Sequence, residues 1–168
     1  MRHALCLLGT LAALAVTSPP VMAQEIVSDI LIFERGQWTV TKTTMDDGMQ
    51  YCVAAVRGET AWVNIWLEAD GTTTLQFDSD DWGYDIATET FIATIDNRKS
   101  LPLGAPEFDG SSVNFLLPYT DGNVSFFADL RAGQDLFLNN TAGELIANFP
   151  LSGSSASIVA AVDCMDRM

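Results

Sequence analysis

The densest group of side chains that could do chemistry lies in one short acidic segment. It carries Asp78, Asp80, Asp81 and Glu89. Asp78, Asp80, Gly83 and Glu89 match the first, third, sixth and twelfth positions of a twelve-residue calcium loop. The fifth position should offer an oxygen, but it is Trp82, and the flanking residues predict strands instead of the helices of an EF-hand. We expect a solvated turn with Trp82 folded back on the core, and we keep a calcium site on the four acids as an alternative.

The same segment could supply a pair of catalytic carboxylates. Asp80, Asp81, Asp85 and Glu89 are dense enough for two of them to lie close together. Glycoside hydrolysis needs two such groups across a sugar-binding cleft, which a sequence does not reveal. In an acidic protein, acids on the surface are the ordinary case, so a carboxylate-based hydrolase is a second alternative.

Other catalytic chemistry lacks its residues. The only histidine is His3, which lies in an N-terminal segment that we expect to be removed. Without an imidazole base, Ser-His-Asp and Cys-His catalysis are excluded, and so are histidine zinc sites. No glycine-rich phosphate loop occurs either. We therefore expect no catalytic residues, and no cofactor apart from calcium in the alternative above.

Three tryptophans suggest a different kind of site. Trp62 and Trp66 fall on one face of an expected strand with Asn64 between them, and Trp82 follows in the acidic segment. Sugar-binding proteins expose such rings, although tryptophan in a β domain usually belongs to the core. We keep Trp62, Trp66 and Trp82 as candidate ligand-binding residues for a glycan.

The N-terminus has the three parts of a cleaved secretory signal. Arg2 gives a positive end, Ala4 to Val16 form an apolar run, and small residues lead to Ala23. The run is shorter than the ~20 residues that a membrane-spanning helix needs. We expect a signal peptide over 1–23, cleaved after Ala23, and a single β-rich domain over 24–168. The protein would then be periplasmic or secreted, with no integral membrane segment.

Cleavage would leave Cys52 and Cys164 as the only cysteines. A pair of cysteines in an oxidising compartment predicts a disulfide, and the alternative is two free buried thiols. Such a bridge would close a loop over most of the domain. The chain-entropy model values a loop of this size at about 4–5 kcal/mol of stability.

The charge is strongly negative. The whole chain has 8 basic and 22 acidic residues, and the segment after residue 23 has a formal charge of 7 − 22 = −15. We do not expect nucleic-acid binding, because it depends on contacts of Lys and Arg side chains with phosphates. The charge serves either solubility or docking of a basic partner or of cations.

Alternating and β-branched segments predict most of the elements. We expect turns at Gly48, Asp70-Gly71 and Thr141 to Gly143, and helices over Val124 to Arg131, capped by Asn123, and from Ser152 or Ser154 to Met165. In the last helix, Ile158, Val162 and Met165 would form the apolar stripe. The expected strands are Trp38–Thr44, Gln50–Val56, Ala61–Leu67, Thr72–Phe77, Phe91–Asp96, Val113–Leu117, Leu136–Leu138 and Leu145–Phe149.

These elements define a mainly β fold. We expect an antiparallel sheet or sandwich of about eight or nine strands, with a short internal helix and a C-terminal helix docked by the disulfide. Residues 61–67, apolar on both faces, should form a central strand. The strand order stays open, and residues 25–35 fit either a strand or a helix.

Several motifs together suggest a family. They are Gly36-x-Trp38, Cys52 in the next strand, the strand end Thr94 to Asp96, and the run Phe149 to Ala156 leading to a helix with Cys164. This layout resembles the invasion-associated locus B family of small exported alphaproteobacterial proteins. The resemblance implies a β-rich periplasmic or surface protein, implicated in some pathogens in host-cell entry, with no established catalytic residues.

The leading hypothesis is therefore a non-enzymatic periplasmic or secreted protein that binds another macromolecule or an envelope component. A calcium- or glycan-binding module is the first alternative, and the carboxylate-based hydrolase is the second.

Overall fold

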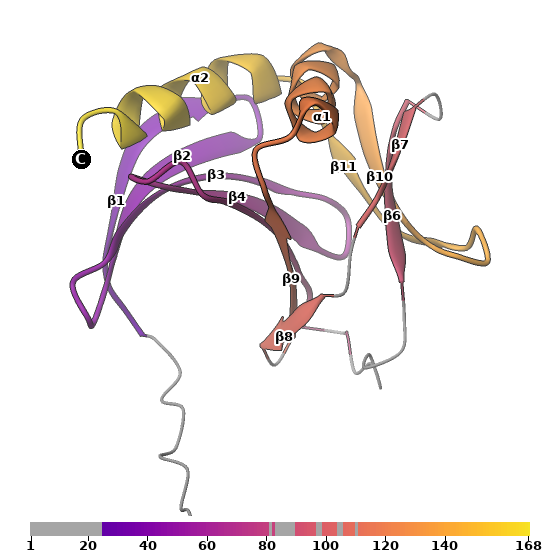
Figure 1. Ribbon diagram of the computed structural model, residues 1–168, viewed down its shortest axis with the longest axis horizontal. Coiled ribbons are helices and arrows are strands. Elements are labelled where there is room, and N and C mark those ends of the chain that lie inside the picture. Colours follow the sequence, from indigo (N-terminus) through magenta and orange to yellow (C-terminus); the bar gives the residue numbers. More distant parts are fainter. Residues whose placement is uncertain (1–24, 81, 83–89, 97–98, 104–105, 110) are drawn as a thin grey trace, which may run out of the picture.

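The computed structural model describes residues 25–80, 82, 90–96, 99–103, 106–109 and 111–168. The expected signal peptide and its cleavage site lie outside these residues. The described chain contains eleven strands and two helices (Figure 1). They are β1 (Ile26–Arg35), β2 (Trp38–Met45), β3 (Gln50–Arg57), β4 (Trp62–Glu68), β5 (Thr73–Asp78), β6 (Phe91–Ile95), β7 (Lys99–Pro102), β8 (Glu107–Asp109), β9 (Ser112–Leu117), α1 (Asp121–Ala132), β10 (Asp135–Asn140), β11 (Leu145–Pro150) and α2 (Ser154–Met165).

The strands form two antiparallel sheets. The larger sheet has the order β1-β2-β3-β4-β5-β9-β8, and the smaller one has the order β11-β10-β6-β7. Figure 1 shows the larger sheet as an arch, with α2 over its outer side and the smaller sheet beside it. The predicted fold class is confirmed, and β4 is the central strand that the sequence predicts. The strands beyond the expected eight or nine are β1, which the sequence left open, and the short β7 and β8, which carry too few residues for a pattern.

Alternation along the strands produces the hydrophobic core. In β3 the alternate side chains of Cys52, Ala54 and Val56 lie on one face and are all fully buried. Between the two sheets lie four phenylalanine rings. Phe77 stands 6.2 Å from Phe115 and 5.6 Å from Phe149, and Phe91 stands 5.8 Å from Phe115, between ring centroids. Because each sheet supplies two of these rings, they join the two layers.

The helix caps differ from those expected. Thr120, not Asn123, caps α1: its Oγ1 accepts a hydrogen bond from the Asn123 amide N–H. The Asn123 side chain donates instead to the carbonyl oxygen of Pro118, 2.7 Å away. The helix therefore begins one turn before the sequence suggests, because the cap is chosen by the path of the preceding loop.

The expected serine cap of α2 is also wrong. Gly153 is the N-cap residue, and no side chain caps the helix. Ser154 is fully buried, and its hydroxyl donates to the Leu130 carbonyl oxygen of α1 at 2.8 Å. The predicted apolar stripe is only partly right, since Val162 is 39% exposed. The buried positions of α2 are Ser154, Ser157, Ile158 and Ala161, small residues for the most part, which let the helix pack closely.

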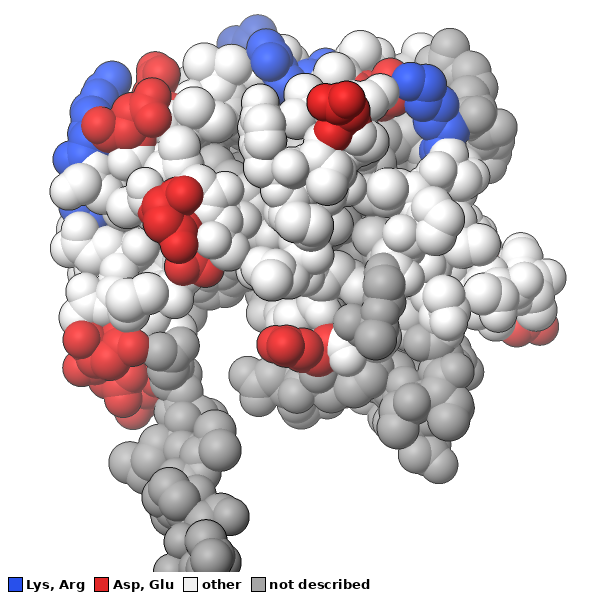
Figure 2. Space-filling view, viewed as in Figure 1, with Lys and Arg blue, Asp and Glu red and all other residues white. Residues whose placement is uncertain are grey.

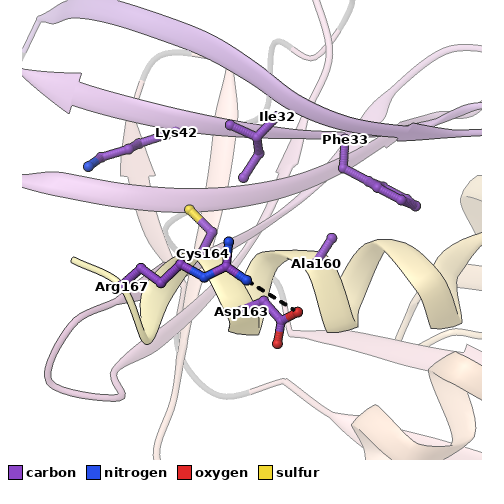
Figure 3. A pocket seen from close by; sticks show the side chains of 7 residues that line it. All are labelled: Ile32, Phe33, Lys42, Ala160, Asp163, Cys164 and Arg167. Atoms are coloured by element: carbon purple, nitrogen blue, oxygen red, sulfur yellow. Dashed lines mark ion pairs between the residues drawn. The ribbon is translucent and has the colours of Figure 1, made fainter.

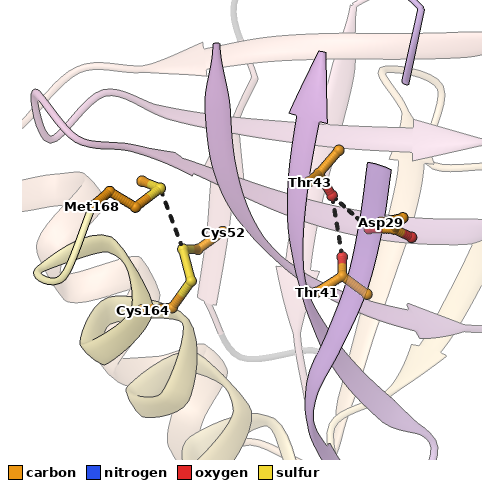
Figure 4. Close-up of a disulfide and its surroundings, with 6 residues drawn as sticks. All are labelled: Asp29, Thr41, Thr43, Cys52, Cys164 and Met168. Carbon is orange, nitrogen blue, oxygen red and sulfur yellow. Dashed lines mark hydrogen bonds between the residues drawn. A yellow bond between two sulfur atoms is a disulfide. The ribbon is translucent and has the colours of Figure 1, made fainter. Parts of the chain in front are cut away.

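The C-terminal end of α2, and the end of β11 shortly before α2 begins, are both bonded to the larger sheet. Near the C-terminal end of α2, Cys164 forms the predicted disulfide with Cys52, with the Cα atoms 6.0 Å apart. The Sδ atom of Met168 lies 3.7 Å from the Cys52 Sγ on one side of this bridge (Figure 4). Before its N-terminal end, the indole N–H of Trp38 donates to the Pro150 carbonyl oxygen at 3.0 Å.

Cys52→Ser should lower the free energy of unfolding by about 2–5 kcal/mol, because the unfolded chain would lose the constraint of the bridge. Urea unfolding of the oxidised protein measures this change. Cys164→Ser should have a similar effect, and reductant should not destabilise either variant further. Equal midpoints for the original protein with and without reductant would contradict the prediction.

Gly153→Ala should be more damaging than Gly48→Ala. Both glycines have a positive φ, at 105° and 85°, so each substitution introduces about 1–2 kcal/mol of backbone strain. A Cβ at Gly153 would also lie 2.4 Å from the Arg35 carbonyl oxygen, whereas one at Gly48 would meet nothing within 4 Å. We expect the clash to add about 1–3 kcal/mol to the loss at Gly153. If urea unfolding shows equal losses of unfolding free energy for the two variants, the clash is relieved by a shift of the β1–β2 turn and the prediction is wrong.

Candidate functional site

The larger sheet has one face that no element of the described chain covers in Figure 1, on the side away from α2. We call it the open face. Residues paired across neighbouring strands share a face, so the strand register identifies its members. Its central side chains are Tyr51, Trp62, Asn64, Trp66, Gln76 and Leu116.

Strand β4 places the two tryptophans on the open face. Val63, Ile65 and Leu67 point into the core and are almost fully buried, so the alternating residues Trp62 and Trp66 point the other way. Trp62 is 40% exposed, and Trp66 is half-buried. The sequence thus predicts correctly that both rings lie on one strand face.

The third candidate tryptophan has a different environment. Trp82 is half-buried and packs against the hydrophobic core, as expected for the turn after β5. Its backbone N–H donates to the Ser79 carbonyl oxygen at 3.2 Å. A ligand role for Trp82 stays a prediction.

Hydrogen bonds hold the centre of the open face. The Gln76 side-chain oxygen accepts from Asn64 Nδ2 at 2.9 Å and from the indole N–H of Trp66 at 3.0 Å. The ring of Tyr51 meets Trp66 edge to face, with centroids 5.5 Å apart. The rings and amides are therefore ordered before any ligand arrives, which lowers the entropy lost on binding.

At the edge of this group, a cation stacks on the exposed tryptophan. The Arg57 guanidinium carbon lies 5.4 Å from the centroid of Trp62, in a cation–π contact. Both residues also line a small polar cavity of about 240 Å³ with Asp78 and Asp80. Trp62 is thus the meeting point of the open face and the acidic segment.

The open face carries mostly negative charge. Arg57 is the basic residue that the described strands place there by register. Acids outnumber it on the same face, and Thr43 donates to one of them, Asp29, at 2.7 Å. Among the acids that register places on this face are Asp29, Glu34, Glu68, Asp78 and Glu107.

These charges act on one another. Partial burial and the nearby Asp70 raise the pKa of Glu68. Partial burial, Glu68 and Asp47 raise the pKa of the Tyr51 phenol. Negative potential is therefore concentrated where β3 begins and β4 ends.

The acidic segment is only partly placed. The Asp78 carboxylate accepts a hydrogen bond from the Ser111 hydroxyl at 2.8 Å, and Asp80 lines the small polar cavity. Asp81, Asp85 and Glu89 lie outside the described residues. Among the described residues, no group of three or more His, Cys, Asp or Glu side chains could hold a metal ion. The calcium and hydrolase hypotheses therefore stay untested predictions.

A second hollow lies beside the disulfide, between β1 and α2 (Figure 3). Its volume is about 300 Å³, and an ion pair of 3.9 Å between Arg167 and Asp163 crosses its α2 side. Both of these side chains are largely exposed, so the pair adds little stability. The lining residues are Ile32, Phe33, Lys42, Ala160, Asp163, Cys164 and Arg167.

Strand β1 presents an apolar edge that sequence reasoning missed. It is the outermost strand of the larger sheet, and irregularities between Ile26 and Ser28 and between Leu31 and Phe33 interrupt its register. Such bulges discourage further strand pairing. Its exposed aliphatic side chains are Ile26, Val27, Ile30, Leu31 and Ile32. Their signal in the sequence was a ten-residue segment whose apolar residues follow no clean alternation. No helix in the described residues has the length and apolar character to span a bilayer.

Two antiparallel sheets, a C-terminal helix and a bridge from that helix to β3 define a class of small disulfide-stapled β proteins. The chain is similar in structure to invasion associated protein B from Bartonella henselae, with a TM-score of 0.56 and 16% sequence identity over 85% of this chain and 98% of that one. No family model matches the sequence, and no curated protein matches it significantly. The likeness shows a common fold.

The raised pKa of Glu68 predicts how stability changes with pH. The folded protein holds the Glu68 proton more tightly than the unfolded chain does, so ionisation destabilises the fold as pH rises above the ordinary value of 4.5. Glu68→Gln removes this loss, so the variant should melt at the same temperature or slightly higher at pH 7. The advantage should vanish at pH 4.

Asp70→Asn is the matched control, because its effect on stability at pH 7 should have the opposite sign. A hydrogen bond from the Thr72 backbone lowers the pKa of Asp70, so its charge favours the folded state. This variant should melt lower than the original protein at pH 7, and the loss should shrink as the pH falls through the folded pKa of Asp70. Thermal unfolding at both pH values checks the two signs, and a Glu68→Gln variant that melts lower at pH 7 would refute the assignment.

Proposed function

We propose that the protein is an exported, non-enzymatic binding protein, and that its open face holds a positively charged segment of a macromolecular partner in the cell envelope. One observation carries the proposal: in the described strands, the uncovered sheet face combines partly exposed aromatic rings with several carboxylates, and Arg57 is the basic residue that register places there.

The aromatic side chains support binding of a large partner. Tyrosine and tryptophan are enriched at the centres of protein interfaces, where they bury much surface with few rotatable bonds. Trp66 is already fixed by Gln76 and Tyr51. Trp62 and Leu116, at 40% and 66% exposed, provide the apolar area that a partner would cover.

The electrostatics support a basic partner. The carboxylates of the open face, in a chain with a formal charge of −14, attract positive groups and repel anionic lipid and nucleic acid. Charge of this kind accelerates association and selects partners more than it adds affinity. Binding should therefore weaken with salt.

The structural neighbour suggests a setting for this binding. Its name associates it with invasion. We accordingly include contact with a host-cell surface among the settings in which the partner would be met.

A glycan is the second candidate ligand of the same face. The exposed indole of Trp62 lies on the same strand face as the amides of Asn64 and Gln76. An aromatic ring beside amide groups suits the apolar faces and hydroxyl groups of a sugar. Such binding would not depend on salt.

Site-specific photo-crosslinking in producing cells tests the main proposal. A benzophenone amino acid at Leu116, on the open face, should capture a basic partner. The same residue at Val159, which is exposed on α2, should not. Cross-linking that is absent, or equal at both positions, would refute the assignment.

The affinity of the purified partner for the Trp62→Ala variant should be at least tenfold weaker. An aromatic residue at the centre of an interface commonly accounts for about 2 kcal/mol or more of the binding free energy, which totals ~8 kcal/mol at micromolar affinity. Val159→Ala is the control and should change little. Retained affinity in Trp62→Ala would exclude the open face. If a glycan array instead yields a neutral sugar whose binding resists salt and requires Trp62, the second candidate replaces the first.

A further inference from the structure

The two helices and the sheet enclose an apolar groove that is separate from the open face. Its volume is about 440 Å³, within the range of sites for small molecules. The sheet contributes Ile65, Leu67 and Leu117, and further apolar residues come from both helices. Those on the helices are Val124, Phe127, Ala128, Ile158, Ala161, Val162 and Met165.

Contacts at the two ends of α2 explain why the groove exists. The bond from Ser154 to the Leu130 carbonyl joins the first turn of α2 to the last turns of α1. The disulfide holds the far end of α2 over β3. The hydrogen bond thus joins the end of α1 to the start of α2, and the groove residues Val124 and Met165 lie toward the opposite ends of the two helices.

Apolar side chains of the groove remain in contact with water. Val124 is 44% exposed and Val162 is 39% exposed, and Tyr119, at 91%, stands at the same groove. Exposed apolar surface that is gathered in one concave place indicates a ligand more than scattered exposure does.

The polar groups of the groove narrow the choice of ligand. Arg131 is the charged residue among its lining side chains, although acids outnumber bases in the chain by 22 to 8. None of the ion pairs between described residues uses Arg131. The other polar side chains are few, and that of Asn123 already donates to Pro118. A bound peptide would bury backbone amide groups that find few hydrogen-bond partners in this groove. An acyl chain has no polar groups that need such partners.

We propose that this groove binds a long-chain fatty acid, with the acyl chain between α1, α2 and the sheet and the carboxylate at the Arg131 guanidinium. The apolar walls supply affinity that grows with chain length, by about fourfold for each buried methylene. Arg131 supplies selectivity for an anionic head group through charge-assisted hydrogen bonds. The proposal does not depend on the open face.

Isothermal titration of the folded, oxidised protein with dodecanoate below its micelle concentration tests the proposal. We expect one bound molecule per chain, and roughly fifteenfold weaker binding of decanoate, which has two methylenes fewer. Dodecyltrimethylammonium, which has the opposite charge, should bind at least tenfold more weakly than dodecanoate. Absence of dodecanoate binding, or equal binding of the two head groups, overturns the proposal.

Two pairs of variants locate the site. Ala128→Phe fills the groove from an exposed position of α1 and should abolish binding, whereas Ala156→Phe, exposed on α2 outside the groove, should not. Arg131→Gln should weaken the binding of dodecanoate at least fivefold and leave the binding of dodecan-1-ol unchanged. Arg167→Gln should leave the binding of both ligands unchanged. Urea unfolding confirms that each variant is folded. Dodecanoate binding that survives Ala128→Phe, or that Arg131→Gln does not weaken, refutes the assignment.

Discussion

The attachment of α2 at both of its ends is the constraint on which the rest of the molecule depends. At one end, Cys164 is bonded to Cys52 in the middle of the larger sheet. At the other, Gly153 comes so close to the Arg35 carbonyl that no side chain fits between them. The helix therefore lies across β1 to β4 and covers only one side of the sheet. A covered side and an open side follow from this one placement.

The two sides differ in chemistry because strand alternation separates residue types. The covered side is apolar, and between α1 and α2 it ends in a groove with Arg131 as its charged residue. The open side has ordered aromatic rings and amides with acids around them. Figure 2 likewise shows acidic residues on the viewed face, several along its lower edge. The two sides of the larger sheet thus present surfaces of different chemistry, one acidic and aromatic and the other apolar.

The motifs that suggest a family maintain the fold. Gly36 and Trp38 meet the run after β11: a Cβ on Gly36 would lie 3.3 Å from the Ser152 carbonyl oxygen, and Trp38 bonds to Pro150. Asp96, at the end of β6, has a positive φ of 51°, and its carboxylate accepts the backbone N–H groups of residues 134 and 135. These residues position strands and helices. This role agrees with a likeness to the Bartonella protein that is one of fold.

The sequence by itself determined the features that depend on local pattern or on counting. Alternation predicted β2 to β6, β9 to β11 and the shared face of Trp62 and Trp66, and the two cysteines that the expected cleavage would leave predicted the bridge. Only the tertiary structure decided the caps at Thr120 and Gly153, the edge position of β1, and the groove. Alternation places side chains on the two faces of a strand, but contacts between distant segments choose the covered face. The named acids of the open face come from four strands, β1, β4, β5 and β8, so only packing could bring them together.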